Sequence, residues 1–331
     1  MASHPYKMIK VRSVDLAPVR ITMEEFATAA TSACCATFLS NPLEVVKTRF
    51  QLQGELSSKG AHQIHYRNFF HAMYVIARTD GLVGLQAGLV PSLWHQIFMN
   101  GFRLSMIQIA EGHGLNKNAQ GEISVPKTAA LSAAAGAITA FTGSPFYMVK
   151  IQLQSQSDAK IAVGTQHHHS GMFSALYNIY DKGGVKGLFR GVTGSLPRRI
   201  VGSSTQYTTF TYCKDFIATN SVQPIPKGLL NSFLASMVAG FVVTGVMNPL
   251  DTISTRLYNQ GVNEKGVGTL YKGYFDCVFK MYKVEGIHGF YKGFVPLYLR
   301  TGPHTVLVFI FWDSIKEWTK EKRFSIVENL E

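Results

Sequence analysis

Apolar residues dominate four long stretches of the chain that contain no charged side chain. These stretches are residues 26–43, 81–102, 128–149 and 228–250, and they are between 18 and 23 residues long. About 20 apolar residues are enough for a helix to cross the hydrocarbon core of a bilayer. Polar and charged residues fill the segments between the stretches. The pattern therefore predicts membrane-spanning helices joined by polar connectors, rather than soluble domains.

Two sequence markers recur three times in the same order. The first places a proline before an acid and a base, or their substitutes, at residues 41–47, 144–150 and 248–254. Its prolines, Pro42, Pro145 and Pro249, are 103 and 104 residues apart. The second marker begins and ends on glycine, at residues 84–88, 187–191 and 289–293. Two markers that stay in phase over three units indicate three homologous repeats of roughly 100 residues.

Each repeat is predicted to contain a helix, a polar loop, a short amphipathic helix and a second helix. The three prolines should kink their helices, because proline removes a backbone hydrogen bond. Small residues stand five positions before each proline, where they let membrane helices approach closely: Thr37, Ala140 and Thr244. We therefore expect an all-α membrane protein with six transmembrane helices and pseudo-threefold symmetry around a central, water-filled cavity. The expected units are a basic tail at 1–22, repeats at 23–120, 121–222 and 223–320, and a tail at 321–331.

Composition narrows the classes of function. The chain has 32 Lys and Arg against 20 Asp and Glu, a net charge of +12, which suits nucleic acid, anionic lipid or anionic solutes as partners. The basic residues form no single block, which argues against nucleic acid. The four cysteines have neither disulfide nor zinc spacing, and no cleavable signal peptide is predicted. No catalytic or phosphate-binding motif is present, so we expect no enzymatic activity, metal or cofactor. The three consecutive histidines, His167-His168-His169, are expected to lie in a solvated loop.

The Pro-x-acid-x-x-base repeat, followed by short helices with glycines, resembles the mitochondrial carrier family, solute carrier family 25. The resemblance covers roughly residues 24–320. It implies a monomeric, multi-pass protein of the inner mitochondrial membrane that moves small solutes by alternating access. Its partners would be the phospholipid bilayer, with cardiolipin as a candidate at the short matrix helices. Within the family, residues 202–206, 300–305 and the pair Phe146-Tyr147 are most similar to the dicarboxylate and oxaloacetate/sulfate carriers.

The resemblance also implies a gate on the matrix side, formed by ion pairs between repeats. The expected pairs are Glu44 with Lys150, Asp251 with Lys47, and Tyr147 with Ser254. The last pair offers at most a neutral hydrogen bond, which is weaker than a charge-assisted one. One helical turn further on, the residues expected to brace the gate are Gln51, Gln154 and Tyr258.

The cytosolic gate departs from the family pattern of an aromatic residue, an acid and a base three residues later. Asp313 and Lys316 fit the pattern, the second repeat keeps only Lys214, and the first repeat has Gln108 and Glu111. Family pairing would place Glu111 near Asp313, and two carboxylates that meet can share a proton, because like charges raise one pKa. A solvated Glu111 is the alternative.

Three residues stand 13 positions before the cytosolic gate positions, about 20 Å along each helix: His95, Arg198 and Arg300. The family binds its substrates at this level. Charge inside a membrane is costly and therefore usually functional, and guanidinium groups bind carboxylates with two parallel hydrogen bonds. We therefore expect Arg198 and Arg300 to bind the two ends of a small dicarboxylate. Hydrogen bonds or further positive charge would come from His95, Gln96, Arg103 and Arg199.

These features favour a secondary transporter of small anions, namely dicarboxylates, oxoacids such as oxaloacetate, or sulfate. Two alternatives remain open. One is an uncoupling-type carrier that dissipates the proton gradient, and the other is a carrier-fold scaffold without transport, which the incomplete charge pairs would fit. The sequence does not distinguish exchange from proton symport.

Overall fold

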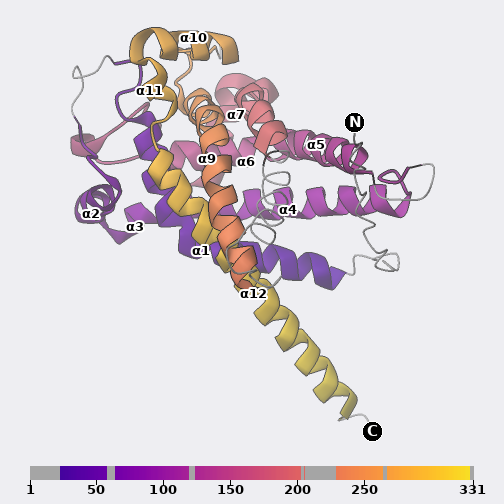
Figure 1. The fold of residues 1–331 in the computed structure, drawn as a ribbon. Helices are drawn as coiled ribbons and strands as arrows, with labels where there is room; N and C mark the ends of the chain where they lie inside the picture. Colours follow the sequence, from indigo (N-terminus) through magenta and orange to yellow (C-terminus); the bar gives the residue numbers. More distant parts are fainter. Residues whose placement is uncertain are drawn as a thin grey trace, which may run out of the picture.

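The computed structural model describes residues 23–57, 64–118, 124–202, 205, 229–263 and 267–328. The described part is helical, and each repeat contributes long and short helices in the predicted order (Figure 1). Residues 192–202 form a further helical segment. The labelled elements are α1 Met23–Leu52, α2 Phe69–Thr79, α3 Gly81–Leu85, α4 Leu89–Gly112, α5 Val125–Thr142, α6 Ser144–Ser155, η1 Ala159–Ile161, α7 Met172–Leu188, α9 Leu229–Asn259, α10 Tyr274–Glu285, α11 Ile287–Phe290 and α12 Phe294–Glu328.

The marker prolines affect the three repeats differently. Helices α1 and α9 continue through Pro42 and Pro249. In the second repeat the helix is interrupted, and α5 and α6 are separated by Gly143, two residues before Pro145. Glycine is a weak helix former and proline lacks a backbone donor, so their proximity explains why only this repeat is broken.

The helices that carry the first marker meet at one end of the molecule. Helices α1, α6 and α9 contact one another in pairs, while α12 lies against both α1 and α9, and α4 lies against α1 and α5. The C-terminal part of α12 projects beyond the other described helices (Figure 1). This arrangement brings all three copies of the first marker into one shared space.

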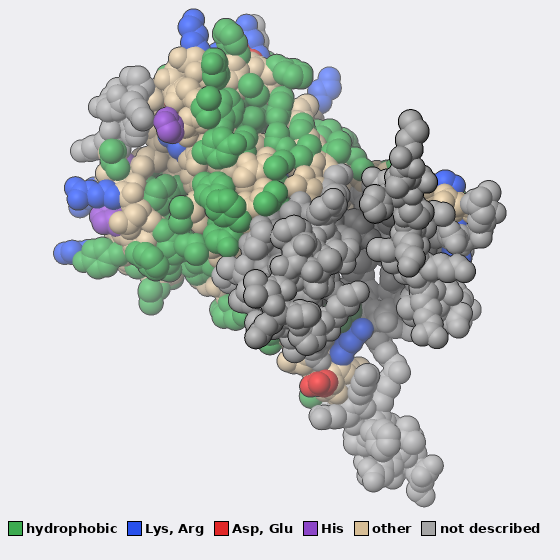
Figure 2. Space-filling model, in the orientation of Figure 1, with side chains coloured by type: hydrophobic (Ala, Val, Ile, Leu, Met, Phe, Trp, Pro, Cys, Tyr) green, Lys and Arg blue, Asp and Glu red, His purple; other side chains and the backbone are tan. Residues whose placement is uncertain are grey.

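Small and polar side chains face inward, while large apolar side chains face outward. Thr37 and Thr244 are at most 2% exposed, whereas Phe38, Phe141 and Phe241 are each more than 50% exposed. Apolar side chains cover much of the visible described surface (Figure 2). Such an inverted distribution is expected where the solvent is lipid. Among the described helices, Ile287–Thr319 is the one that is long and apolar enough to cross a membrane. The six transmembrane helices expected from the sequence therefore stay a prediction.

Buried ion pairs attach the short helices of repeats 1 and 3 to their long helices. Arg49 Nη1 lies 2.6 Å from Asp80 Oδ2, next to α2, and Arg256 Nη1 lies 2.5 Å from Glu285 Oε1 at the end of α10. Repeat 2 has Gln152 and Gly183 at the equivalent positions. The second repeat therefore lacks both the base and the acid of this attachment.

The three consecutive histidines do not form the solvated loop that the sequence suggested. His169 is buried, and its Nε2 lies 3.0 Å from Gln152 Oε1. His167 Nε2 donates to the carbonyl oxygen of Asn259, 2.7 Å away, and burial lowers the pKa of His167 to about 4. Only His168 of the three is exposed. The prediction failed because the loop folds back against the end of α9, a long-range contact that local polarity does not reveal.

The last glycine of each second marker packs against a predicted brace of a neighbouring repeat. A Cβ atom on Gly88 would lie 2.9 Å from the carbonyl oxygen of Lys150, and one on Gly191 would overlap the Tyr258 ring. Gly88 and Gly293 also have positive φ angles, of 67° and 82°. The three contacts are Gly88 with Gln154, Gly191 with Tyr258, and Gly293 with Gln51. This close approach explains why the two markers recur in phase.

Replacing Gly191 with alanine should lower the free energy of unfolding by about 1–3 kcal/mol, because the added methyl group overlaps the buried Tyr258 ring. Thermal unfolding of the purified protein measures the effect. Gly183→Ala is the matched control, since a Cβ atom there would meet no atom within 4 Å. Equal unfolding temperatures for the two variants would contradict the proposed packing.

Removing the Glu285 carboxylate should destabilise the protein in a pH-dependent way. Burial raises the pKa of Glu285, but hydrogen bonds and charge from Arg256 outweigh it and hold the pKa below its ordinary value. A lowered pKa means that the carboxylate stabilises the fold above its ordinary pKa and loses this contribution as the pH falls through the lowered value. Glu285→Gln should therefore cost about 3–5 kcal/mol at pH 7, because Arg256 and Lys292 both lose the carboxylate with which they form ion pairs.

The difference between Glu285→Gln and wild type should shrink at acidic pH, where the wild-type carboxyl group is also neutral. The measurement is the unfolding temperature of both proteins between pH 7 and acidic pH. Asp276→Asn, which removes an exposed partner of Lys280, serves as the control and should change little. A constant difference across the pH range would rule out the Glu285 ion pair as its source.

Candidate functional site

Two buried carboxylates each bind cations from both other repeats. Glu44 of α1 forms ion pairs with Lys150 of α6 and with Arg300 of α12, whose Nη2 lies 2.6 Å from Glu44 Oε1. Asp251 of α9 lies 2.6 Å from Lys47 Nζ of α1. Two of the three expected gate pairs are therefore present in the structure, and each expected gate carboxylate has an additional partner.

The second partner of Asp251 is an arginine that we had expected to bind substrate. Arg198, in the helical segment 192–202, places Nε 2.6 Å from Asp251 Oδ1, although the N–H bond does not point at that oxygen. Arg300, also expected to bind substrate, contacts Glu44 through its Nη2. Sequence spacing does not reveal these contacts, because they depend on how far long side chains reach between helices.

The third expected contact, between Tyr147 and Ser254, is absent. Ser254 Oγ is buried and has no hydrogen-bond partner among the described residues. The Tyr147 ring instead packs edge-on against the Tyr258 ring, with centroids 5.2 Å apart, and near the Arg198 guanidinium, 5.1 Å from its ring centroid. The bulky phenol ring is thus held by other rings and a cation, and the expected hydrogen bond to Ser254 does not form.

The three predicted braces have different contacts. Gln51 Nε2 donates to Asp251 Oδ2 at 2.8 Å, so it contacts an expected gate ion pair directly. Gln154 Oε1 instead accepts from Thr48 Oγ1 at 2.9 Å. Tyr258 joins repeats through its hydroxyl group, which lies 3.0 Å from both Ser144 Oγ and Ser195 Oγ. All three connect neighbouring repeats, but only Gln51 binds a carboxylate of the gate.

A cavity of about 90 Å³ lies among these groups. Its lining includes Lys47, Lys150, Arg198, Arg199 and Arg300. Among the described residues, Glu44 and Asp251 are the carboxylates paired with four of these cations, Lys47, Lys150, Arg198 and Arg300, so the positive charges of this set outnumber the negative ones by two. Arg198 Nη1 and Arg300 Nε are buried without a hydrogen-bond partner in the described part of the chain. Unpaired buried donors beside a cavity are suited to bind an anion.

His95 orients one of these cations rather than facing the cavity with a free nitrogen. Its Nδ1 lies 3.2 Å from the carbonyl oxygen of Gly143, and its Nε2 lies 2.9 Å from Arg199 Nη2. A guanidinium only donates, so His95 Nε2 accepts and Nδ1 carries the proton of a neutral ring. Both nitrogens have partners in this conformation, so the expected hydrogen bond from His95 to a substrate oxygen stays a prediction.

His304 contacts Gln96, a residue of the cavity lining, and sequence analysis did not predict it as part of the site. Its Nδ1 lies 2.9 Å from Ser40 Oγ, and its Nε2 lies 3.3 Å from Gln96 Nε2, which also donates to Thr37 Oγ1. The available signal was its position one helical turn after Arg300, which places both side chains on one face of α12. His304 therefore connects Gln96 of repeat 1 with repeat 3.

Several predicted residues cannot be placed in the site. Lys214 lies outside the described residues, as do the side chains of Arg103, Gln108, Glu111 and Asp313. Lys316 Nζ lies over the Trp312 ring, 4.6 Å from its centroid. The cytosolic gate and the proton shared by Glu111 and Asp313 therefore stay predictions.

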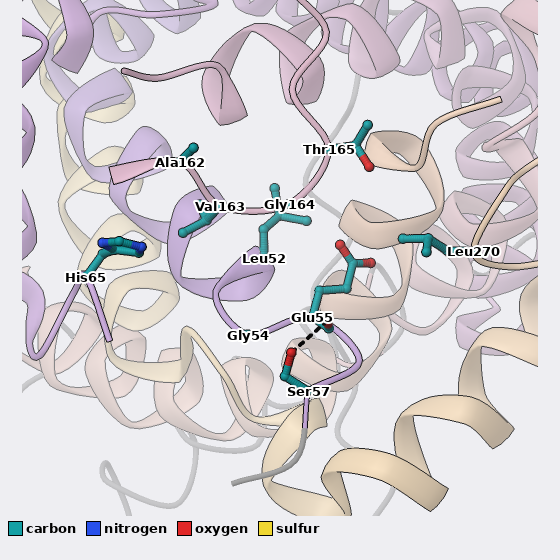
Figure 3. Close-up of a pocket in the computed structure, with 10 residues that line it drawn as sticks. All are labelled: Leu52, Gly54, Glu55, Ser57, His65, Ala162, Val163, Gly164, Thr165 and Leu270. Atoms are coloured by element: carbon teal, nitrogen blue, oxygen red, sulfur yellow. Dashed lines mark hydrogen bonds between the residues drawn. The ribbon is translucent and has the colours of Figure 1, made fainter. Parts of the chain in front are cut away.

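A larger cavity, of about 380 Å³, is lined by none of these cations (Figure 3). Glu55, Ser57 and His65 line it together with Thr165 from the loop after η1 and Leu270. Its lining contains a carboxylate but no Lys or Arg, and burial raises the pKa of Glu55. The larger cavity therefore does not suit an anion, and the smaller one is the candidate binding site.

Comparisons with known proteins agree with the repeat structure. The sequence profile described as "Mitochondrial carrier protein" matches three successive segments, residues 20–116, 121–221 and 226–323. The chain is 47% identical over 292 residues to "Solute carrier family 25 member 35" of Homo sapiens, covering 88% of this chain and 97% of that protein.

Two relatives have names that state a solute. The "Mitochondrial oxaloacetate transport protein" of Saccharomyces cerevisiae is 37% identical over 295 residues, which cover 87% of each chain. The "Mitochondrial citrate transporter E" of Aspergillus niger is 36% identical over 316 residues, covering 93% of this chain and 99% of that protein. With three matching repeats and relatives aligned over most of its length, the chain belongs to the mitochondrial carrier family, whose members are transporters and not enzymes.

Proposed function

We propose that this carrier moves a small anion with at least two negative charges across the inner mitochondrial membrane by alternating access. The candidates are dicarboxylates, oxoacids such as oxaloacetate, and sulfate. The observation that carries the proposal is the excess of two positive charges in the ion-paired set around the buried cavity, four cations against two carboxylates. Uncompensated charge in a buried site is costly, so a multiply charged anion is the ligand that this site favours.

The names of the relatives support the same class of solute. Oxaloacetate and citrate, which appear in two of those names, both carry several carboxylates. The name "Solute carrier family 25 member 35" states no substrate, so it does not narrow the choice. The shared chemistry is a compact anion with two or more negative groups.

Arg198 and Arg300 would bind two negative groups of the anion from different repeats. The N–H groups at Arg198 Nη1 and Arg300 Nε are buried and donate a hydrogen bond to no described group. Arg199, held by His95, adds positive charge, and the Gln96 side chain provides polar atoms for a hydroxyl or keto oxygen. The selectivity of the site would then depend on charge first and on these polar contacts second.

The gate would be closed toward the matrix in this conformation, because Glu44–Lys150 and Asp251–Lys47 are formed. Opening requires these helices to separate after the anion binds. The helices carrying Pro42, Pro145 and Pro249 would move as units, within six membrane spans of a single multi-pass chain. The same proposal includes the phospholipid bilayer as a partner, with cardiolipin at the short helices. It also includes the repeat boundaries 23–120, 121–222 and 223–320.

Purified protein in liposomes should take up labelled malate, oxaloacetate or sulfate. The uptake would occur either in exchange for one of these anions inside the liposomes or together with protons. The expected uptake exceeds that of a monovalent anion or a cation of similar size, because the cavity has an excess of positive charge. Proton conductance without anion movement would instead identify an uncoupling-type carrier. Absence of any anion movement by folded protein would favour the scaffold.

Charge removal provides the control for this measurement. Arg300→Gln should lower uptake by about 100-fold, corresponding to about 3 kcal/mol for a lost charge-assisted contact. Lys280→Gln removes a positive charge from the largely exposed Asp276–Lys280 pair on α10 and should leave uptake unchanged. An equal effect of the two substitutions would discredit the cavity as the binding site.

A further inference from the structure

The described ion pairs between repeats are unevenly distributed over the three seams, where a seam is the contact between two repeats near the cavity. Seam 1–2 contains Lys150–Glu44, and seam 3–1 contains both Lys47–Asp251 and Arg300–Glu44. Across seam 2–3, Arg198–Asp251 is the one ion pair among the described residues. A symmetric gate would give every seam a pair from the first marker.

Seam 2–3 lacks its marker pair because Tyr147 and Ser254 replace the acid and the base. Its other described contacts are hydrogen bonds without a carboxylate. Ser155 Oγ donates to Asn259 Oδ1 at 2.7 Å, and Arg190 Nη2 donates to the carbonyl oxygen of Gln260 at 3.2 Å. Such bonds hold the seam, but an anion in the cavity does not compete for them.

Repeat 2 also lacks the ion pair that attaches the short helix in the other two repeats. Repeats 1 and 3 attach their short helices through Arg49–Asp80 and Arg256–Glu285, and these carboxylates also accept backbone N–H groups from the neighbouring repeat. Asp80 accepts from Asp158 and Glu285 accepts from Leu56, at 3.0 Å and 2.9 Å. Repeat 2 has Gly183 in place of this acid, so seam 2–3 has no such contact.

We propose that Arg198 supplies the missing gate link of seam 2–3, and that the substrate anion opens this seam first by drawing Arg198 away from Asp251. The proposal rests on the anion-transport function given above. Arg198 suits both roles, because its Nε contacts Asp251, its Nη1 is buried without a hydrogen-bond partner among the described residues, and the residue is part of the cavity lining. An anion in the cavity therefore competes with Asp251 for a single guanidinium group.

The competition has different consequences at the other seams. When the anion takes Arg198, Asp251 keeps Lys47 as its counter-ion, so no buried carboxylate is left unpaired. Seam 2–3 then retains only neutral or backbone contacts among the described residues. When the anion also takes Arg300 from Glu44, seam 3–1 still retains Lys47–Asp251, and seam 1–2 retains Lys150–Glu44. Only seam 2–3 loses its ionic link entirely.

Disulfide trapping in the full-length carrier tests this order of opening. In a background with the four native cysteines replaced, one cysteine pair is introduced across each seam at residues that now share a short hydrogen bond. The pairs are Thr48→Cys with Gln154→Cys, Gln51→Cys with Thr255→Cys, and Ser155→Cys with Asn259→Cys, which replace contacts of 2.9, 2.8 and 2.7 Å. The rate of disulfide formation is measured with and without oxaloacetate.

Oxaloacetate should slow trapping several-fold at 155/259 and much less at the other two pairs. Arg198→Gln should slow trapping at 155/259 even without any anion, because it removes the link directly. Arg300→Gln is the matched control: it removes an arginine of the same cavity, but its seam keeps Lys47–Asp251, so trapping at 51/255 should persist. The unchanged rate at 48/154 shows that each variant is folded.

A restored marker pair provides a second readout. Tyr147→Glu together with Ser254→Lys should return the trapping rate at 155/259 toward its original value in the Arg198→Gln background. The proposal is overturned if Arg198→Gln leaves 155/259 unchanged, or if Arg198→Gln and Arg300→Gln slow all three pairs alike. If oxaloacetate changes the trapping rate of no pair while Arg198→Gln still slows trapping at 155/259, oxaloacetate is rejected as the substrate. The gate link through Arg198 is then still supported.

Discussion

The pairing of Glu44 and Asp251 with cations of the other two repeats is the interaction on which the rest of this structure depends. Buried charges are tolerated only when they are paired, and breaking such a pair costs several kcal/mol. Each carboxylate has two cationic partners from different repeats, so the first-marker helices are held together at one point. The remaining positive charge lies beside a cavity, so under the proposed function one set of side chains both joins the repeats and binds the anion.

Packing around this point follows from the same constraint. Helices that share buried charges must approach closely, and the closing glycines of the second marker allow it by lying directly against Gln51, Gln154 and Tyr258. Apolar side chains such as Phe38 and Phe141 are left on the outside. The inverted distribution of polarity is thus a consequence of placing charged groups at the centre of a protein whose surroundings are apolar.

The sequence predicted most of this arrangement, because repeats, prolines and marker residues recur at fixed spacing. The pairs of Glu44 and Asp251 with lysines could be assigned from that spacing. The contacts of Arg198 and Arg300 with the same carboxylates could not, since they depend on side-chain reach across helices. The burial of His169 and the contacts of His304 were missed for a related reason, because each depends on contacts between segments distant in sequence. The break at Gly143 is a local effect of Gly143 and Pro145, which the repeat pattern alone did not reveal.

If excess buried positive charge selects a multiply charged anion, ligands of one shape but different charge should bind with different affinities. Malate, its monoamide and its diamide differ in charge but little in size, and their affinities for the purified carrier follow from the stabilisation each gives against thermal unfolding. Malate should bind most tightly, and the affinity should fall about tenfold for each carboxylate removed, roughly 1.4 kcal/mol per charge-assisted contact. Equal affinities for malate and its diamide would show that buried charge does not select the ligand.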